Sequence, residues 1–92
     1  MPHVYLLHFD KKIADHAGHY CGSTPNGTAE RLALHLKGQG SRLCEVAVER
    51  GCQITLANEW EYDNWHEARV YERRLKNEKH LARHCPICQG VA

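Results

Sequence analysis

The sequence predicts an α+β fold, in which a small three-stranded sheet is flanked by three helices in the order β-β-α-α-β-α. Two kinds of observation support this prediction. Segments rich in β-branched, aromatic or alternating apolar residues occur at 4–9, 19–23 and 53–60, as is typical of strands. Segments with apolar residues three or four positions apart occur at 28–37, 41–51 and 64–82, and these indicate helices.

Turn and capping residues mark the boundaries between these elements. The turn Pro25-Asn26-Gly27 precedes the first helix, for which Thr28 is the expected N-cap, and Gly38 is expected to end that helix. Asn64, followed three residues later by Glu67, resembles a capping box at the start of the last helix.

Length and composition predict one globular domain over residues 1–92. The motif-bearing part spans about 3–84, and 85–92 form a C-terminal tail with a CxxC motif. With 42% hydrophobic and 25% charged residues, the chain is not expected to be disordered. No apolar run approaches the roughly 20 residues of a membrane span, and the first residues lack the features of a signal peptide. We therefore expect a cytoplasmic protein.

Positive charge is concentrated in the second half of a chain whose net charge is only +1. The last predicted helix and its continuation carry Arg69, Arg73, Arg74, Lys76, Lys79 and Arg83. Such a surface is expected to contact the phosphates of a nucleic acid, with Arg73, Arg74, Lys76 and Lys79 as the candidate binding residues.

Five side chains have the chemistry that phosphodiester hydrolysis requires. Their predicted places are two neighbouring strands, the first helix and the last helix, and they are Tyr5, Tyr20, Arg31, His35 and Glu72. Either phenol could activate water, the guanidinium suits a phosphate, and the imidazole can relay a proton. Near a guanidinium and a metal, a phenolate should become more accessible. The single carboxylate could hold Mg²⁺ or another divalent cation, although Glu72 could also simply pair with Lys76.

The order of these residues resembles that of the GIY-YIG nuclease family, over about residues 3–76. His3-Val4-Tyr5 and Tyr20-Cys21-Gly22 stand for the two tripeptides, and EARVYERRLK is similar to the family's metal-binding helix. The resemblance implies a small metal-dependent endonuclease that cleaves DNA, like the catalytic domains of homing endonucleases, with the catalytic roles at the five residues above. The chain lacks the first tripeptide's glycine and the family's late asparagine, and the loop between the tripeptides is longer than usual.

Two alternatives remain open. The first is a non-catalytic nucleic-acid-binding module on the same scaffold. The second is a small zinc-binding interaction protein, in which Cys85 and Cys88 would provide two zinc ligands.

The cysteines and histidines leave the metal chemistry open. The odd number of cysteines, five, favours reduced thiols over a disulfide framework, and we expect Cys85 and Cys88 to be unpaired. If zinc binds there, the further ligands to consider are His80, His84, Cys44 and Cys52. Histidines also gather in the first hairpin, where we expect His3 and His19 to face each other.

Overall fold

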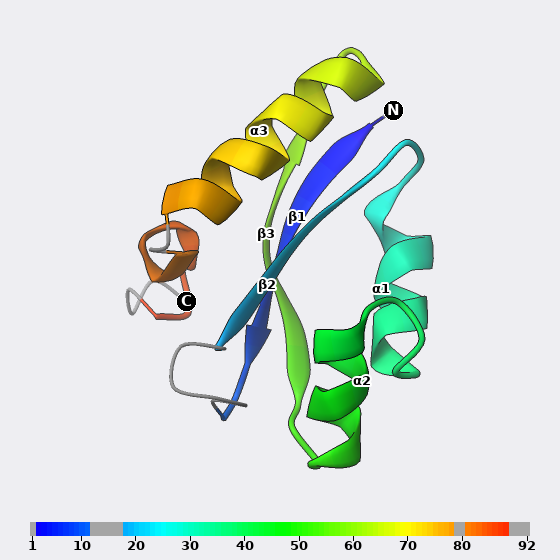
Figure 1. Ribbon diagram of the computed structural model, residues 1–92, viewed down its shortest axis with the longest axis vertical. Helices are drawn as coiled ribbons and strands as arrows, with labels where there is room; N and C mark the ends of the chain where they lie inside the picture. Colours follow the sequence, from blue (N-terminus) through cyan, green and yellow to red (C-terminus); the bar gives the residue numbers. More distant parts are fainter. Residues whose placement is uncertain (1, 12–17, 79–80, 89–92) are drawn as a thin grey trace.

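The computed structural model of the chain describes residues 2–11, 18–78 and 81–88 (Figure 1). It confirms the predicted fold class and the order of the elements. These are β1 (His3–Phe9), β2 (His19–Thr24), α1 (Thr28–Leu36), α2 (Arg42–Glu49), β3 (Ile54–Glu61) and α3 (Trp65–Glu78), followed by a 3₁₀ turn, η1 (Leu81–His84). The last helix was expected to continue to about residue 82. Instead, α3 ends at Glu78 and η1 is a separate element.

The three strands form an antiparallel sheet in the order β2-β1-β3. The central strand, β1, pairs with β2 so that Tyr5 lies opposite Gly22, and His8 lies opposite His19. Because side chains alternate along a strand and residues directly opposite each other share a face, this register decides which side chains meet.

Each face of the sheet carries its own hydrophobic core. Val4 and Leu6 pack toward α3, together with Ala68 and Leu75 of that helix. Tyr5, Leu7 and Phe9 belong to the other core, with residues of α1 and α2. Figure 1 shows α3 on one side of the sheet, with α1 and α2 on the other. Because it is covered on both faces, β1 is the most buried element of the sheet.

The helices begin close to the predicted positions, but the N-cap of α1 is not the predicted residue. The Ser41 side chain accepts a hydrogen bond from the Cys44 N–H at the start of α2, and Asn64 Oδ1 accepts one from the Glu67 N–H before α3. Thr28 was expected to cap α1, and this prediction was wrong. Gly27 occupies the N-cap position without a side-chain hydrogen bond, and Thr28 lies buried in the first turn.

The segment after α3 returns to the sheet and packs against it. Cys85 is fully buried in the core that contains Val4 and Leu6. The side-chain amide of Asn58, on β3, donates a hydrogen bond to the His84 carbonyl over 3.1 Å. The C-terminal residues that the structure describes are therefore part of the fold. Among the described residues, no helix has the length and apolar character needed to cross a membrane.

Candidate functional site

Tyr5 and His35 form a hydrogen-bonded pair in the core between the sheet and α1. The Tyr5 hydroxyl lies 2.8 Å from His35 Nε2, and neither residue is exposed to solvent. The alternation along β1 turns Tyr5 toward α1, while its position near the end of α1 turns His35 toward the sheet. Two of the five predicted site residues are thus in direct contact.

Tyr20 completes this group from β2. Its ring centroid lies 5.1 Å from that of His35 and 6.4 Å from that of Tyr5. Unlike the other two, Tyr20 is only partly buried. We call Tyr5, Tyr20 and His35 the hydrogen-bonded cluster, after the bond between Tyr5 and His35; Tyr20 belongs to it through its ring contacts. Within it, Tyr20 is the residue that solvent reaches.

Two glycines allow the cluster to form. A Cβ at Gly22 would lie 2.5 Å from the Tyr5 hydroxyl oxygen, and a Cβ at Gly40 would lie 2.3 Å from His35 Nδ1. Real Cβ atoms do not approach other atoms so closely, so the backbone can cover both side chains only where glycine stands. The glycine of the Tyr20-Cys21-Gly22 tripeptide is therefore needed to seat Tyr5.

Arg31 lies one helical turn before His35 and is partly buried beside the cluster. Its Nη2 donates a hydrogen bond to the Gly40 carbonyl over 3.4 Å. Its buried Nε has no hydrogen-bond partner among the described residues. The guanidinium is close enough to influence the pKa values of Tyr5, Tyr20 and His35. A cation with an unused N–H group therefore lies at the border of the cluster.

Glu72 reaches the same region from α3, on the other side of the edge strand β2. Its carboxylate accepts a short hydrogen bond from the Ser23 hydroxyl, and it lies 2.8 Å from Lys76 Nζ. The Lys76 ammonium lies 5.8 Å from the centroid of the Tyr20 ring. Lys76, predicted as a phosphate-binding residue, thus connects Glu72 with the hydrogen-bonded cluster.

Burial controls the ionisation of the cluster. It raises the pKa of Tyr5 to about 12, although the Arg31 guanidinium acts in the opposite direction. Burial likewise raises the pKa of Tyr20, against the effect of Lys76. Burial and then Arg31 lower the pKa of His35. The sequence led us to expect accessible phenolates, whereas in the protein alone both phenols are protonated at neutral pH and the imidazole is uncharged.

The pKa of the Glu72 carboxyl group is lowered, in contrast to the raised pKa values of Tyr5 and Tyr20. Burial alone would raise the pKa of its carboxyl group, but Lys76 and Ser23 outweigh that effect and lower it. The side chain is 15% exposed. Glu72 is therefore an ionised carboxylate at neutral pH that solvent can still reach.

The other predicted basic residues lie apart from the cluster. Arg73 and Arg74 are exposed on α3. Lys79 lies outside the described residues. The exposed guanidiniums are available to a large polyanion, whereas Lys76 is already paired with Glu72.

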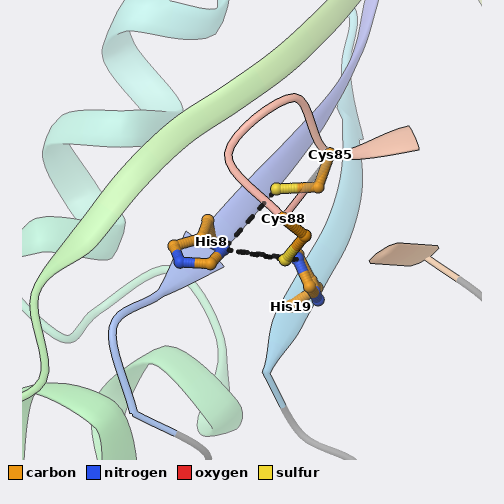
Figure 2. Close-up of side chains that lie close together, drawn as sticks. All are labelled: His8, His19, Cys85 and Cys88. Atoms are coloured by element: carbon orange, nitrogen blue, oxygen red, sulfur yellow. Dashed lines mark hydrogen bonds between the residues drawn. The ribbon is translucent and has the colours of Figure 1, made fainter. Parts of the chain in front are cut away.

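A second group of polar side chains lies at the far end of the β1–β2 hairpin (Figure 2). His8 on β1, His19 on β2, and Cys85 and Cys88 after η1 place one ligand atom each within 4.8 Å of all the others. We call these four residues the metal-ligand cluster. Burial and then the neighbouring His8 lower the pKa of His19, so its imidazole is uncharged at neutral pH and able to bind a cation. The cluster could bind a metal ion.

The sequence indicated the two cysteines of this cluster as zinc ligands and placed His19 among the histidines of the first hairpin, facing His3 in a pair that could bind metal. His84, considered as a further ligand, instead lies 2.7 Å from a carboxylate oxygen of Glu78. Cys44 and Cys52 belong to the core on the opposite face of the sheet, and His80 lies outside the described residues.

The expected pairing of His3 with His19 was also wrong. His3 lies opposite Thr24, where it contacts Glu61 and Asn26, and His8 is the residue that faces His19. The sequence indicates the two strands but not the register that pairs His8 with His19. No local signal in the sequence indicated that the cysteines fold back onto it.

No protein-family model, no curated protein and no solved structure matches the chain.

Proposed function

We propose that this protein is a metal-dependent endonuclease that hydrolyses DNA phosphodiester bonds beside the edge strand β2. The observation that carries the proposal is the arrangement of the five residues expected to perform this chemistry. Tyr5 and His35 are hydrogen-bonded, Tyr20 and Arg31 lie next to them, and Lys76 links Glu72 to Tyr20. These residues come from four elements, β1, β2, α1 and α3, and a general packing requirement would not bring this set together.

Tyr20 is the residue proposed to activate water. It is the partly exposed member of the hydrogen-bonded cluster, whereas the Tyr5 hydroxyl is covered by Gly22. The neighbouring Lys76 ammonium favours the phenolate form of Tyr20 and so opposes the effect of burial on its pKa. In the reaction, Tyr20 acts as a phenolate, its own proton having passed to solvent, and its Oη takes the proton of the attacking water. As the new P–O bond forms, the bond to the leaving oxygen breaks, and that oxygen takes a proton from solvent.

Tyr5 and His35 act as positioning residues in this proposal. Their hydrogen bond fixes the imidazole against the Tyr20 ring, which limits the orientations that Tyr20 can adopt. The Arg31 guanidinium supplies donors for the oxygens of the phosphorane, on which negative charge develops. Its unpaired Nε is consistent with a partner that arrives with the substrate.

Glu72 has the properties of a ligand for Mg²⁺. It is an ionised, partly exposed carboxylate, and Ser23 provides a second oxygen beside it. Protein sites for Mg²⁺ commonly use one or two carboxylates plus substrate oxygens, because the ion keeps much of its own water. When bound, the ion would supply positive charge to the phosphate group.

The DNA backbone would lie along α3, where Arg73 and Arg74 extend from the turn that follows Glu72. Contacts of this kind release counterions, so the affinity for DNA should fall steeply as the salt concentration rises.

The experiment that tests the proposal measures cleavage of supercoiled, linear and branched DNA in Mg²⁺ or Mn²⁺. The wild-type chain is compared with Glu72→Gln, and Glu67→Gln on the same helix is the matched control. We expect cleavage by the wild type and by Glu67→Gln, and loss of cleavage in Glu72→Gln and in the presence of EDTA. DNA binding without turnover in any condition would instead indicate the non-catalytic module.

A second candidate function is that of a small zinc-binding interaction protein, and the metal-ligand cluster favours it. For zinc, the described residues provide four side-chain ligands, whereas for Mg²⁺ they provide one carboxylate. Zinc is therefore the cofactor with the more complete structural support. The two functions do not exclude each other, because the hydrogen-bonded cluster and the metal-ligand cluster lie on opposite faces of the hairpin.

A further inference from the structure

The metal-ligand cluster is built from three separate parts of the chain. The register of the hairpin places His8 directly opposite His19, and both side chains lie on the face of the sheet that carries Cys21 and Leu6. Cys85 and Cys88, in the turn after η1, approach this pair from above the same face, and Figure 2 shows all four side chains converging.

Four of the six distances between ligand atoms in the cluster are close to the edges of a tetrahedron around one zinc ion, and the other two are no longer than 4.8 Å. Zn–S bonds of about 2.3 Å and Zn–N bonds of about 2.05 Å at tetrahedral angles imply N–S edges of about 3.6 Å and an N–N edge of about 3.3 Å. His8 Nδ1 lies 3.5 Å from Cys85 Sγ and 3.6 Å from Cys88 Sγ. His19 Nε2 lies 3.3 Å from Cys88 Sγ and 3.4 Å from His8 Nδ1.

The choice of ligand atoms distinguishes zinc from other metal centres. Two thiolates and two imidazoles are soft or borderline ligands, which do not suit Mg²⁺ or Ca²⁺. A two-iron cluster with two histidines and two cysteines binds the two kinds of residue to different irons. Nitrogen and sulfur atoms only 3.3 to 3.6 Å apart instead fit ligands that share a single ion.

We propose that His8 Nδ1, His19 Nε2, Cys85 Sγ and Cys88 Sγ bind one structural Zn²⁺. Four protein ligands leave no open position for water or substrate, which is the property of a structural site. The ion joins residue 8 to residue 88 and so closes a loop that contains almost the whole chain. It thereby fixes the segment after α3 to the β1–β2 hairpin, next to Tyr20.

A metal ion that joins the two ends of the chain would stabilise a domain of this size. A domain of 92 residues has a small core, and metal binding that occurs only in the folded state adds directly to its stability. Cys85 is already fully buried in the core beside α3. This inference gives the zinc-binding candidate function its ligands, and it holds whether or not the protein cleaves DNA.

The test measures zinc by mass spectrometry in protein purified without added metal. We expect about one zinc per chain in the wild type. The variants Cys88→Ser and His19→Gln should retain less than a tenth of it, while Cys52→Ser, a thiol on the opposite face, should retain it all. Equal zinc content in all four proteins, or none in the folded wild type, would overturn the proposal.

A second measurement requires no variant. Co²⁺ added to the metal-free wild type should produce the intense visible absorption of a tetrahedral ion with thiolate ligands, and one equivalent of Zn²⁺ should abolish that absorption. Weak absorption typical of octahedral Co²⁺ would contradict the assigned ligands. Because neither readout involves DNA, failure of this inference is distinguishable from failure of the nuclease proposal.

Discussion

The two polar clusters of this protein stand on the same hairpin but satisfy their atoms in different ways. In the hydrogen-bonded cluster, the Tyr5 hydroxyl and His35 Nε2 are hydrogen-bonded to each other, while His35 Nδ1 is buried without a hydrogen-bond partner among the described residues. In the metal-ligand cluster, two imidazoles and two thiols instead place one ligand atom each within 4.8 Å of all the others. The role of a histidine here therefore depends on the groups it faces: His35 is held in place, while His8 and His19 can hold an ion.

Because successive side chains of a strand point to opposite faces, the two clusters lie on opposite faces of the hairpin. Tyr5 and Tyr20 face α1 and α2, whereas His8 and His19, at positions of the opposite parity, face η1. A hairpin of only two short strands can therefore carry two sites that share backbone but no side chain. If the sites are as separate in their effects as in their positions, a substitution in one should leave the other unchanged.

A large effect is expected from Arg31→Ala. If this guanidinium stabilises the charge of the phosphorane, its removal should lower the cleavage rate by about 10²- to 10³-fold. Arg42→Ala, an exposed arginine on α2 that pairs with Glu45, is the control and should cleave at the wild-type rate. Zinc content should be unchanged in both. Equal rates for the two variants would remove Arg31 from the reaction.

Gly22→Ala should displace Tyr5 from the hydrogen-bonded cluster, because the added Cβ would occupy the space of its hydroxyl. The added Cβ would lie 2.5 Å from the Tyr5 hydroxyl oxygen, and overpacking of this kind costs about 1–3 kcal/mol of stability. At Gly27, where φ is −73° and an added Cβ would meet nothing within 4 Å, the same substitution should cost less, because it loses only the preference of the N-cap position for glycine over alanine. Denaturant unfolding of both variants checks the difference, and equal stabilities would contradict the close approach.

Tyr5→Phe tests whether Tyr5 positions the cluster for catalysis, in addition to stabilising the fold. Removal of the hydroxyl leaves His35 Nε2 buried without its partner, which should cost about 1–3 kcal/mol. Because Tyr5 positions the cluster and does not contact substrate in this account, kcat should fall while the pH at which the rate is half-maximal stays unchanged. A shift of that midpoint would indicate instead that Tyr5 is itself the base.

The smallest effect is expected on the stability of Glu72→Gln at acidic pH. The pKa of Glu72 is lowered in the folded protein, so its contribution to stability is present above about pH 4.5 and is lost as the pH falls through the folded-state pKa. Since the carboxylate is partly exposed and its ion pair is screened by solvent, the contribution should be below about 1 kcal/mol. Unfolding of Glu72→Gln should depend less on pH below 4.5 than that of the wild type or of Glu59→Gln, an exposed control on β3.

The sequence predicted those features that depend on neighbouring residues. The strands, the helices and the capping residue Asn64 follow from local patterns, and so does the spacing that puts Arg31 and His35 on one side of α1. The hydrogen bond between Tyr5 and His35 was within reach because both residues were already singled out. The raised pKa of Tyr5, about 12, could not be predicted in this way, because burial causes it and burial depends on the whole fold.

The metal-ligand cluster shows what local patterns omit. Cys85 and Cys88 have the spacing of zinc ligands, but their partners lie near the other end of the chain. The relevant information is the exact register of the hairpin together with the path of the chain after α3, and neither has a sequence signature. The helix end at Glu78 is one part of that path, because an α3 continuing to residue 82 would have left no separate η1 segment before Cys85.

The most direct test of this account is the Mg²⁺-dependent cleavage rate of Tyr20→Phe, measured on protein of known zinc content. Tyr20 belongs to the hydrogen-bonded cluster, while the adjacent His19 belongs to the metal-ligand cluster. The account predicts about one zinc per chain and a rate lowered by about 10²- to 10⁴-fold, the usual contribution of a general base. A wild-type rate, or zinc lost together with activity, would contradict the assignment of the two clusters to separate roles.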